Sequence, residues 1–286
     1  MNSRSSSSSS DGAAKHCRLV SNAIASDNGA ARVALLRKYH ERGIDICVCE
    51  GPTGDNAPSV IWAASHGCVD VIKLLHELGA DMNTSDEQEG LTPMWVAAMH
   101  DHVEAIRLLY ELGADVNTSD IEGHTPMYLA AQKGQVAAIR TLCELGADPN
   151  VALINGCTPM FVASKYGYVE AIRALFELGA DINTPNKDGV TPAHIAAYKG
   201  HGKAVKLLCK LGANLNGTAF GRTPAETAWA AGNSAVAENL TRYSSQCACC
   251  GKQASVAVKL SACSRCRTTY YCSAACQKQD WKQHKK

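Results

Sequence analysis

The residues of this sequence that are most suited to chemistry are cysteines. Six of the seven cysteines that crowd one segment form two C-x-x-C pairs and one C-x-x-x-C pair, and His284 follows them: the seven are Cys247, Cys249, Cys250, Cys263, Cys266, Cys272 and Cys276. Two cysteines three positions apart can turn their thiolates toward one ion, and a spacing of four places two on one face of a helical turn. Thiolate and imidazole ligands suit Zn²⁺, and the histidine makes an iron–sulfur cluster the poorer match. The spacing therefore predicts zinc.

The remaining cysteines are scattered along the chain and show no ligand spacing. We expect them to be buried or half-buried small hydrophobic residues without chemistry. They are Cys17, Cys47, Cys49, Cys68, Cys143, Cys157 and Cys209.

Other catalytic signals are missing from the sequence. It contains no glycine-rich phosphate loop, no Ser/His/Asp arrangement and no paired carboxylates. A zinc ion with three protein ligands could activate water, but Asp280 is the only carboxylate in the cysteine-rich segment that could serve as the base. We therefore expect a protein that is not an enzyme.

Composition bounds the remaining classes. The 28 Lys and Arg residues nearly cancel the 27 Asp and Glu residues, which argues against a surface devoted to nucleic acid or anionic membrane. Only 6% of residues are aromatic, so the core must be built mainly from Ala, Leu, Ile and Val. No apolar run approaches the roughly 20 residues that span a bilayer, and the start MNSRSSSSSSDG lacks the apolar stretch of a secretion signal. We expect an intracellular protein of the cytoplasm, the nucleus or both.

A repeat with a period of about 33 residues precedes the cysteine-rich segment. Thr-Pro occurs in register at Thr92, Thr125, Thr158, Thr191 and Thr223, and Gly-Ala recurs in the same phase. Thr can cap the first free amides of a helix, and Pro fits the first helical position. Each unit thus predicts a short helix, a second amphipathic helix that ends at Gly-Ala, and a β-turn before the next Thr-Pro.

These units resemble the ankyrin repeat. The family's T-P-L-H-x-A-A-x-x-G and L-L-x-x-G-A-D-V-N appear here as TPAHIAAYKG and LLYELGADVN. The resemblance implies a mainly α fold, an ankyrin-repeat solenoid of helix-turn-helix plus β-turn units. A stack of repeats leaves apolar faces open at both ends, so caps are expected.

The expected segments follow from this resemblance. The copy at 57–89 is degenerate, with Pro58 and Ser59 where Thr-Pro should stand. We expect a disordered Ser-rich tail at 1–14, an ankyrin-repeat domain at 15–243 (helical cap 15–47, repeats 57–220, C-terminal cap 221–243) and the cysteine-rich segment at 247–286.

Three repeats depart from the family at its histidine position. Trp95, Tyr128 and Phe161 stand there, and histidine occurs only at His194. We interpret the three aromatic residues as packing between repeats rather than as a ladder that stacks a ligand. His102 belongs to a His-x-His pair with His100, but it falls on the family's ordinary Gly-His position, so we predict no metal there.

The resemblance also implies a surface that binds other proteins, formed by the turn tips and the outer edges of the first helices. Only a few of its residues would carry most of the binding energy. By their place in the repeat, the residues expected to be exposed on it are Ser119, Ile121, Glu122, His124, Gln132, Lys133, Ile154, Asn155, Ser164, Lys165, Lys187, Asp188, Tyr198 and Lys199.

The string YYCSAACQKQDWKQHKK resembles the MYND zinc finger, and residues 247–286 cover nearly all of that pattern. The resemblance implies two interleaved zinc sites with Cys249 as a bystander. The family's eighth ligand, a Cys four residues after the His, would lie two positions beyond Lys286, a gap that a truncated chain or gene model would explain. For the sequence as it stands we predict weak or absent metal at the second site. The implied ligands are Cys247, Cys250, Cys272 and Cys276 for the first zinc, and Cys263, Cys266 and His284 for the second.

MYND fingers generally bind short proline-rich peptides. On the resemblance, Gln277 and Trp281 occupy positions that line the peptide groove, although Trp281 could instead form the core of the small domain. The leading hypothesis is a non-catalytic adaptor or scaffold that binds proteins through both modules, with no membrane and no small-molecule substrate. The alternative is a nucleic-acid-associated transcriptional regulator, because residues 247–286 hold eight basic residues and one acidic residue, but no base-reading helix is evident.

Overall fold

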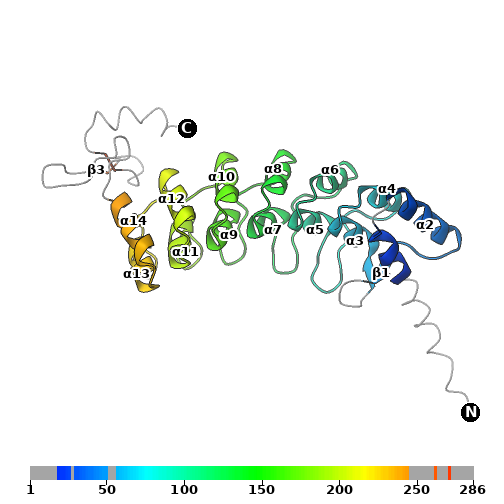
Figure 1. Cartoon of the computed structure of the whole chain (residues 1–286), viewed down its shortest axis with the longest axis horizontal. Coiled ribbons are helices and arrows are strands. Elements are labelled where there is room, and N and C mark those ends of the chain that lie inside the picture. Colours follow the sequence, from blue (N-terminus) through cyan, green and yellow to red (C-terminus); the bar gives the residue numbers. More distant parts are fainter. Residues whose placement is uncertain (1–17, 27–28, 51–55, 245–260, 263–269, 272–286) are drawn as a thin grey trace, which may run out of the picture. The chain divides into compact units, whose positions relative to one another are not determined.

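The computed structural model describes residues 18–26, 29–50, 56–244, 261–262 and 270–271. The chain divides into two compact units, Met1–Asp148 and Pro149–Lys286. In each unit the described residues form pairs of short helices that follow one another along the chain (Figure 1). The prediction of a mainly α fold built from helical repeats is confirmed.

The first unit begins with two helices, continues through a β-hairpin and then forms three helix pairs. Neighbouring first helices pack on one another, as do neighbouring second helices. The elements are a helix over 18–24, α2 (Gly29–Glu41), β1 (Val48–Glu50), β2 (Asn56–Pro58), α3 (Ser59–Ser65), α4 (Val69–Glu77), α5 (Pro93–Met99), α6 (Val103–Glu111), α7 (Pro126–Lys133) and α8 (Val136–Glu144).

The second unit has three helix pairs and a short hairpin. α9, α11 and α13 pack in one row, and α10, α12 and α14 pack in another (Figure 1). The elements are α9 (Pro159–Tyr166), α10 (Val169–Glu177), α11 (Pro192–Tyr198), α12 (Gly202–Lys210), α13 (Pro224–Ala230), α14 (Ser234–Ser244), β3 (Ser261–Ala262) and β4 (Tyr270–Tyr271).

The first helices begin where the Thr-Pro pairs predict. The hydroxyl of Thr92 accepts a hydrogen bond from the amide of Trp95 at 3.2 Å, and Thr125 and Thr158 do the same for Tyr128 and Phe161. In every case Pro occupies the first helical turn, where its missing N–H removes no bond.

The degenerate copy starts its first helix by other means. α3 has Pro58 at its N-cap position and no side-chain cap. Instead, β2 pairs antiparallel with β1, and the Ser59 amide donates to the Cys47 carbonyl at 2.8 Å. The hairpin therefore fixes the chain where Thr caps the other first helices.

The core of each unit lies between the two rows of helices. The second helices contribute fully buried Ile and Leu side chains, and the first helices contribute Ala pairs such as Ala130–Ala131 and Ala196–Ala197. Small alanines let neighbouring first helices approach closely, so stacking buries apolar surface that one repeat could not bury alone.

In four of the repeats, a polar side chain at the start of the second helix donates a hydrogen bond to a backbone carbonyl of the preceding repeat. The ring Nε2 of His102 donates to the Ser65 carbonyl at 3.0 Å, and His201 donates to the Lys165 carbonyl at the same distance. The amide of Gln135 donates to Met99 at 3.1 Å, and that of Asn233 donates to Ala197 at 3.0 Å. We call these four side chains, His102, Gln135, His201 and Asn233, the backward hooks.

The turn that receives a hook needs glycine at its most crowded position. Gly167 has φ +75°, and a Cβ added to it would lie 2.6 Å from Cγ of His201. Asp101 adopts a similar φ of 62° without being glycine. Its Oδ1 accepts from the amide of Ala138 at 2.7 Å, which offsets part of the strain of a left-handed backbone.

Candidate functional site

Ile121 is an exposed apolar candidate on a turn tip of the first unit, with 73% of its surface accessible. The loop that carries it is closed by Asp120, whose Oδ1 accepts from the amides of Glu122 and His124 at 3.0 and 2.8 Å. Oδ2 of Asp120 lies 2.9 Å from Nδ1 of His124, whose ring also contacts Tyr128. His124 is therefore half-buried and stabilises the loop. Gln132, on α7, is also half-buried. Three other candidates are exposed: Ser119, Glu122 and Lys133.

The turn tips of the second unit carry four exposed candidates, Ile154, Asn155, Lys187 and Asp188. The amide of Lys187 donates to the Asn155 carbonyl at 2.9 Å, which links neighbouring tips. Oδ1 of Asn186 accepts from the amides of Asp188 and Val190, so Asn186 closes this turn in the same way that Asp120 closes the loop around Ile121. Ile154 is 79% exposed and points an apolar side chain into solvent.

The ends of α9 and α11 add exposed aromatic and basic residues. Nζ of Lys165 lies 5.6 Å from the ring centre of Tyr166, and Nζ of Lys199 lies 5.5 Å from that of Tyr198. These are cation–π distances, although at an exposed site each contact contributes only about 0.5–1 kcal/mol.

The expectation that Ser164 is exposed is wrong. Ser164 is fully buried, and its hydroxyl has no hydrogen-bond partner among the described residues. It takes the place in α9 that Ala197 takes in α11, so this position faces the core. Counting from Thr158 shows that the exposed pair is Lys165 and Tyr166, and Tyr166 is the surface residue that the sequence interpretation missed.

The residues at the family's histidine position are structural. Trp95, Tyr128 and Phe161 are buried, as the packing interpretation requires. His194 is also buried: its Nδ1 lies 2.8 Å from the Thr191 hydroxyl, and its Nε2 donates to the Arg222 carbonyl at 3.1 Å. Burial lowers the pKa of His194, and its bonds to the carbonyls of Arg222 and Gly217 oppose that shift.

His100 and His102 do not converge on a common ligand. The two rings stack with centres 6.0 Å apart, and His102 uses its Nε2 as a backward hook. Among the residues with described side chains, no group of three or more His, Cys, Asp or Glu residues could hold a metal ion.

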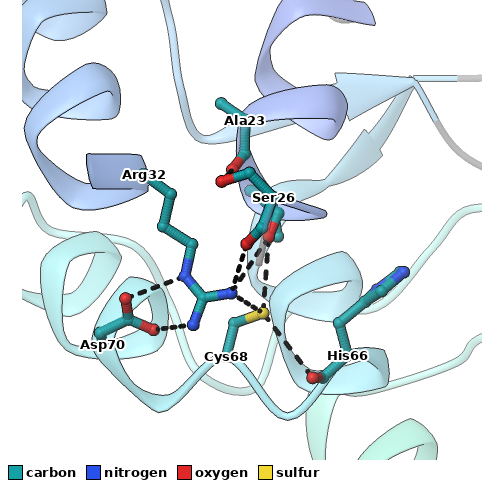
Figure 2. Close-up of polar contacts among 7 residues, drawn as sticks. Ala23, Ser26, Arg32, His66, Cys68 and Asp70 are labelled. Carbon is teal, nitrogen blue, oxygen red and sulfur yellow. Dashed lines mark hydrogen bonds and ion pairs between the residues drawn. The ribbon is translucent and has the colours of Figure 1, made fainter. Parts of the chain in front are cut away.

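An ion pair that the sequence interpretation missed joins α2 to α4, the second helix of the degenerate repeat (Figure 2). Nε and Nη2 of Arg32 donate to the two carboxylate oxygens of Asp70 at 2.9 and 2.7 Å. Nη1 of Arg32 also donates to the carbonyl of Ser26 at 3.2 Å and lies 3.0 Å from Sγ of Cys68. This cluster ties α2, the preceding loop and α4 together; we call it the Arg32 clamp.

Five of the scattered cysteines are described, and all five are free thiols that are buried or half-buried: Cys47, Cys68, Cys143, Cys157 and Cys209. Burial raises the pKa of Cys209 to about 12, against a weak opposing effect of a backbone hydrogen bond. A thiol that stays protonated at neutral pH is a poor nucleophile, which agrees with the expectation of no chemistry for this residue. The side chains of Cys17 and Cys49 lie outside the described part.

The zinc ligands expected from the sequence also lie outside the described residues, together with Gln277, Trp281 and the bystander Cys249: the ligands are Cys247, Cys250, Cys263, Cys266, Cys272, Cys276 and His284. The hairpin within this segment is described: Ser261 pairs with Tyr271, and Ala262 pairs with Tyr270. Along the sequence, Cys263 follows β3 directly and Cys272 follows β4 directly. A donor set of thiolates and one imidazole fits zinc.

No helix in the described part of the chain is long and apolar enough to cross a membrane.

Comparison with known families agrees with the helical repeats. A family model for ankyrin repeats matches three overlapping stretches, residues 60–153, 120–186 and 160–249. A second model, for the MYND finger, matches residues 247–286. No curated protein matches the chain significantly. Ankyrin repeats and MYND fingers are both protein-interaction modules that are typically non-catalytic, and a MYND finger implies zinc binding. Because the ankyrin model covers well over half of its residues, this chain belongs to the ankyrin-repeat family and carries a MYND finger after its repeats.

Proposed function

We propose that this protein is a non-catalytic intracellular adaptor that holds two kinds of protein segment on one chain. The observation that carries the proposal is that each unit exposes large apolar side chains on closed, hydrogen-bonded turn tips, Ile121 in the first unit and Ile154 in the second. Rigid tips lose little conformational entropy when a partner binds. Two surfaces on one chain can raise the effective concentration of a bivalent partner.

We assign the second surface to the finger, as a domain over residues 247–286 that is separate from the repeats at 15–243. Zinc held by its cysteines would order this domain, and Gln277 and Trp281 would line a groove for short proline-rich peptides. A proline-rich segment is already extended in solution, so it loses little entropy on docking against an aromatic side chain.

A fluorescence anisotropy titration of a labelled proline-rich peptide tests this assignment. Trp281→Ala should weaken binding about tenfold, the scale of an aromatic contact in an interface. Trp229→Ala is the matched control, because Trp229 is half-exposed on α13 in the repeats. Zinc content must remain equal in the three proteins. A loss of zinc in Trp281→Ala would indicate that Trp281 belongs to the core of the finger rather than to a peptide groove. Unchanged affinity in Trp281→Ala would remove the groove from the proposal.

The basic character of residues 247–286 favours a second candidate, association with nucleic acid. Binding through phosphates weakens steeply as salt rises, because condensed counterions are released. Retention of a DNA duplex at about 0.15 M salt, with a steep loss on further addition, would support this candidate over the adaptor.

A further inference from the structure

The second unit combines large apolar and basic side chains on neighbouring turn tips and helix ends. We call the set of Ile154, Lys165, Lys187, Tyr198, Lys199 and Phe220 the lysine–aromatic face. All six residues are exposed, and Ile154 and Phe220 are each 79% exposed. Such large apolar side chains in solvent need a reason when they recur in successive repeats.

Contacts place these tips and helix ends beside one another. The Lys187 amide bonds the Asn155 carbonyl next to Ile154, and α9 packs on α11, which packs on α13. Ile154 and Lys187 therefore lie on neighbouring tips, and Lys165 and Tyr198 lie on helices that pack against each other.

Phe220 occupies a backbone position that disfavours it. It has φ 50° in the tight turn between Ala219 and Arg222, which exchange two backbone hydrogen bonds. Glycine, asparagine or aspartate is the ordinary choice at such a left-handed position, and a bulky residue is strained there. Phe220 gains nothing from burial in this structure, so its ring is retained at a cost in stability.

The three lysines of the face, Lys165, Lys187 and Lys199, form no ion pair with any carboxylate that the structure describes. Two carboxylates of the same unit bond within their own loops: Glu226 accepts from the backbone amide and the hydroxyl of Thr223, and Oδ2 of Asp188 lies 3.4 Å from the side-chain amide nitrogen of Asn186.

We propose that the lysine–aromatic face binds an acidic partner segment that carries large apolar side chains, whose carboxylates pair with the three lysines while its apolar side chains pack on Ile154, Tyr198 and Phe220. This inference rests on the proposed adaptor function and names the chemistry of one partner. In surfaces of this kind, lysine–carboxylate pairs supply charge complementarity, and contacts with aromatic side chains supply most of the affinity.

Selection of random dodecapeptides displayed on phage, with the full chain as bait, tests the inference. Peptides that lose binding to the double variant Lys165→Glu/Lys199→Glu should be acidic and should contain large apolar residues. For a labelled peptide of this class, the double variant should weaken binding about tenfold, as two exposed charge pairs are reversed. Raising KCl from about 0.05 M to about 0.5 M should weaken binding to the unmodified chain as well.

Two further variants separate binding from folding. Lys203→Glu/Lys206→Glu is the matched control, because both lysines are exposed on α12 outside the face; it should leave affinity within about twofold. Phe220→Gly should weaken binding while it preserves or raises the melting temperature, since glycine relieves the left-handed strain.

The outcomes distinguish this inference from the adaptor proposal. Neutral or basic selected peptides, peptides indifferent to Lys165→Glu/Lys199→Glu, or no enriched peptide that depends on this face would overturn the inference. Peptides that bind elsewhere on the repeats or depend on Trp281 would leave the adaptor function standing. Failure of the full chain to bind any peptide or protein segment would count against both.

Discussion

The Asp70→Asn substitution tests the Arg32 clamp directly. It keeps the size of the side chain but removes the charge that pairs with the guanidinium. The Arg32 side chain is 17% exposed and that of Asp70 is 32% exposed, so the pair lies between the surface and the core. Exposed pairs contribute at most about 1 kcal/mol, whereas breaking a buried pair costs about 3–5 kcal/mol. We therefore expect Asp70→Asn to destabilise the docking of α2 by about 2 kcal/mol.

Amide hydrogen exchange followed by mass spectrometry measures this local opening. A loss of about 2 kcal/mol corresponds to roughly thirtyfold faster exchange in peptides that cover α2, with smaller effects in peptides that cover α11 and α12. A double-mutant cycle that adds Arg32→Gln should give a coupling energy above about 1 kcal/mol.

A second ion pair provides the matched control. Arg37 and Glu77 also join α2 to α4, at 2.6 Å, but their side chains are 50% and 57% exposed. Water screens this pair, so the same cycle there should give a coupling of only about 0.3 kcal/mol. Equal coupling energies in the two cycles, or unchanged exchange in Asp70→Asn, would refute the argument that burial makes the Arg32 clamp the stronger tie.

Four other predictions concern stability, protonation and metal. Ser164→Ala should raise the free energy of unfolding in urea by about 1 kcal/mol, because it removes a buried hydroxyl that has no partner among the described residues; a decrease would contradict this. Burial lowers the pKa of His194 below 6.5, so as pH falls through that value the unfolded chain takes up a proton more readily and stability should fall; His194→Gln should flatten the pH profile of the melting temperature. Cys209, with a pKa of about 12, should react with iodoacetamide at about pH 8 only after denaturation, as judged by mass spectrometry. Chelation should spare the helical circular dichroism of the repeats while it unfolds the finger, because zinc binding contributes the folding free energy of such a small domain.

Features that repeat along the chain could be predicted from the sequence. The Thr-Pro period located the starts of five first helices, because a Thr cap followed by Pro acts locally. The recurrence of an aromatic residue at one position identified core residues for the same reason. The interpretation of Ser164 as exposed is wrong because α9 was read one residue out of register, and polarity alone does not distinguish a buried serine from an exposed one.

Features that join distant, non-repeating residues could not be predicted. Arg32 and Asp70 are 38 residues apart and belong to no motif, so only the packing of α2 against α4 brings them together. The β1–β2 hairpin lies between the cap and the first repeat, where the period has not yet begun. The Asn83 side chain likewise donates to the Gly113 carbonyl and accepts from the Asp115 amide of the next repeat. A single asparagine in a turn does not predict such a contact between repeats.

The backward hooks have a mechanical consequence. Each one joins residues only 36 or 37 positions apart, and the four donors are two histidines, a glutamine and an asparagine. A force that pulls on the two ends of the chain would therefore act on several similar hydrogen bonds between neighbouring repeats, rather than on one contact between residues far apart in the sequence. These bonds should break one at a time as the force rises, so that repeats unfold in small steps. When the force is removed, each repeat can refold against its folded neighbour.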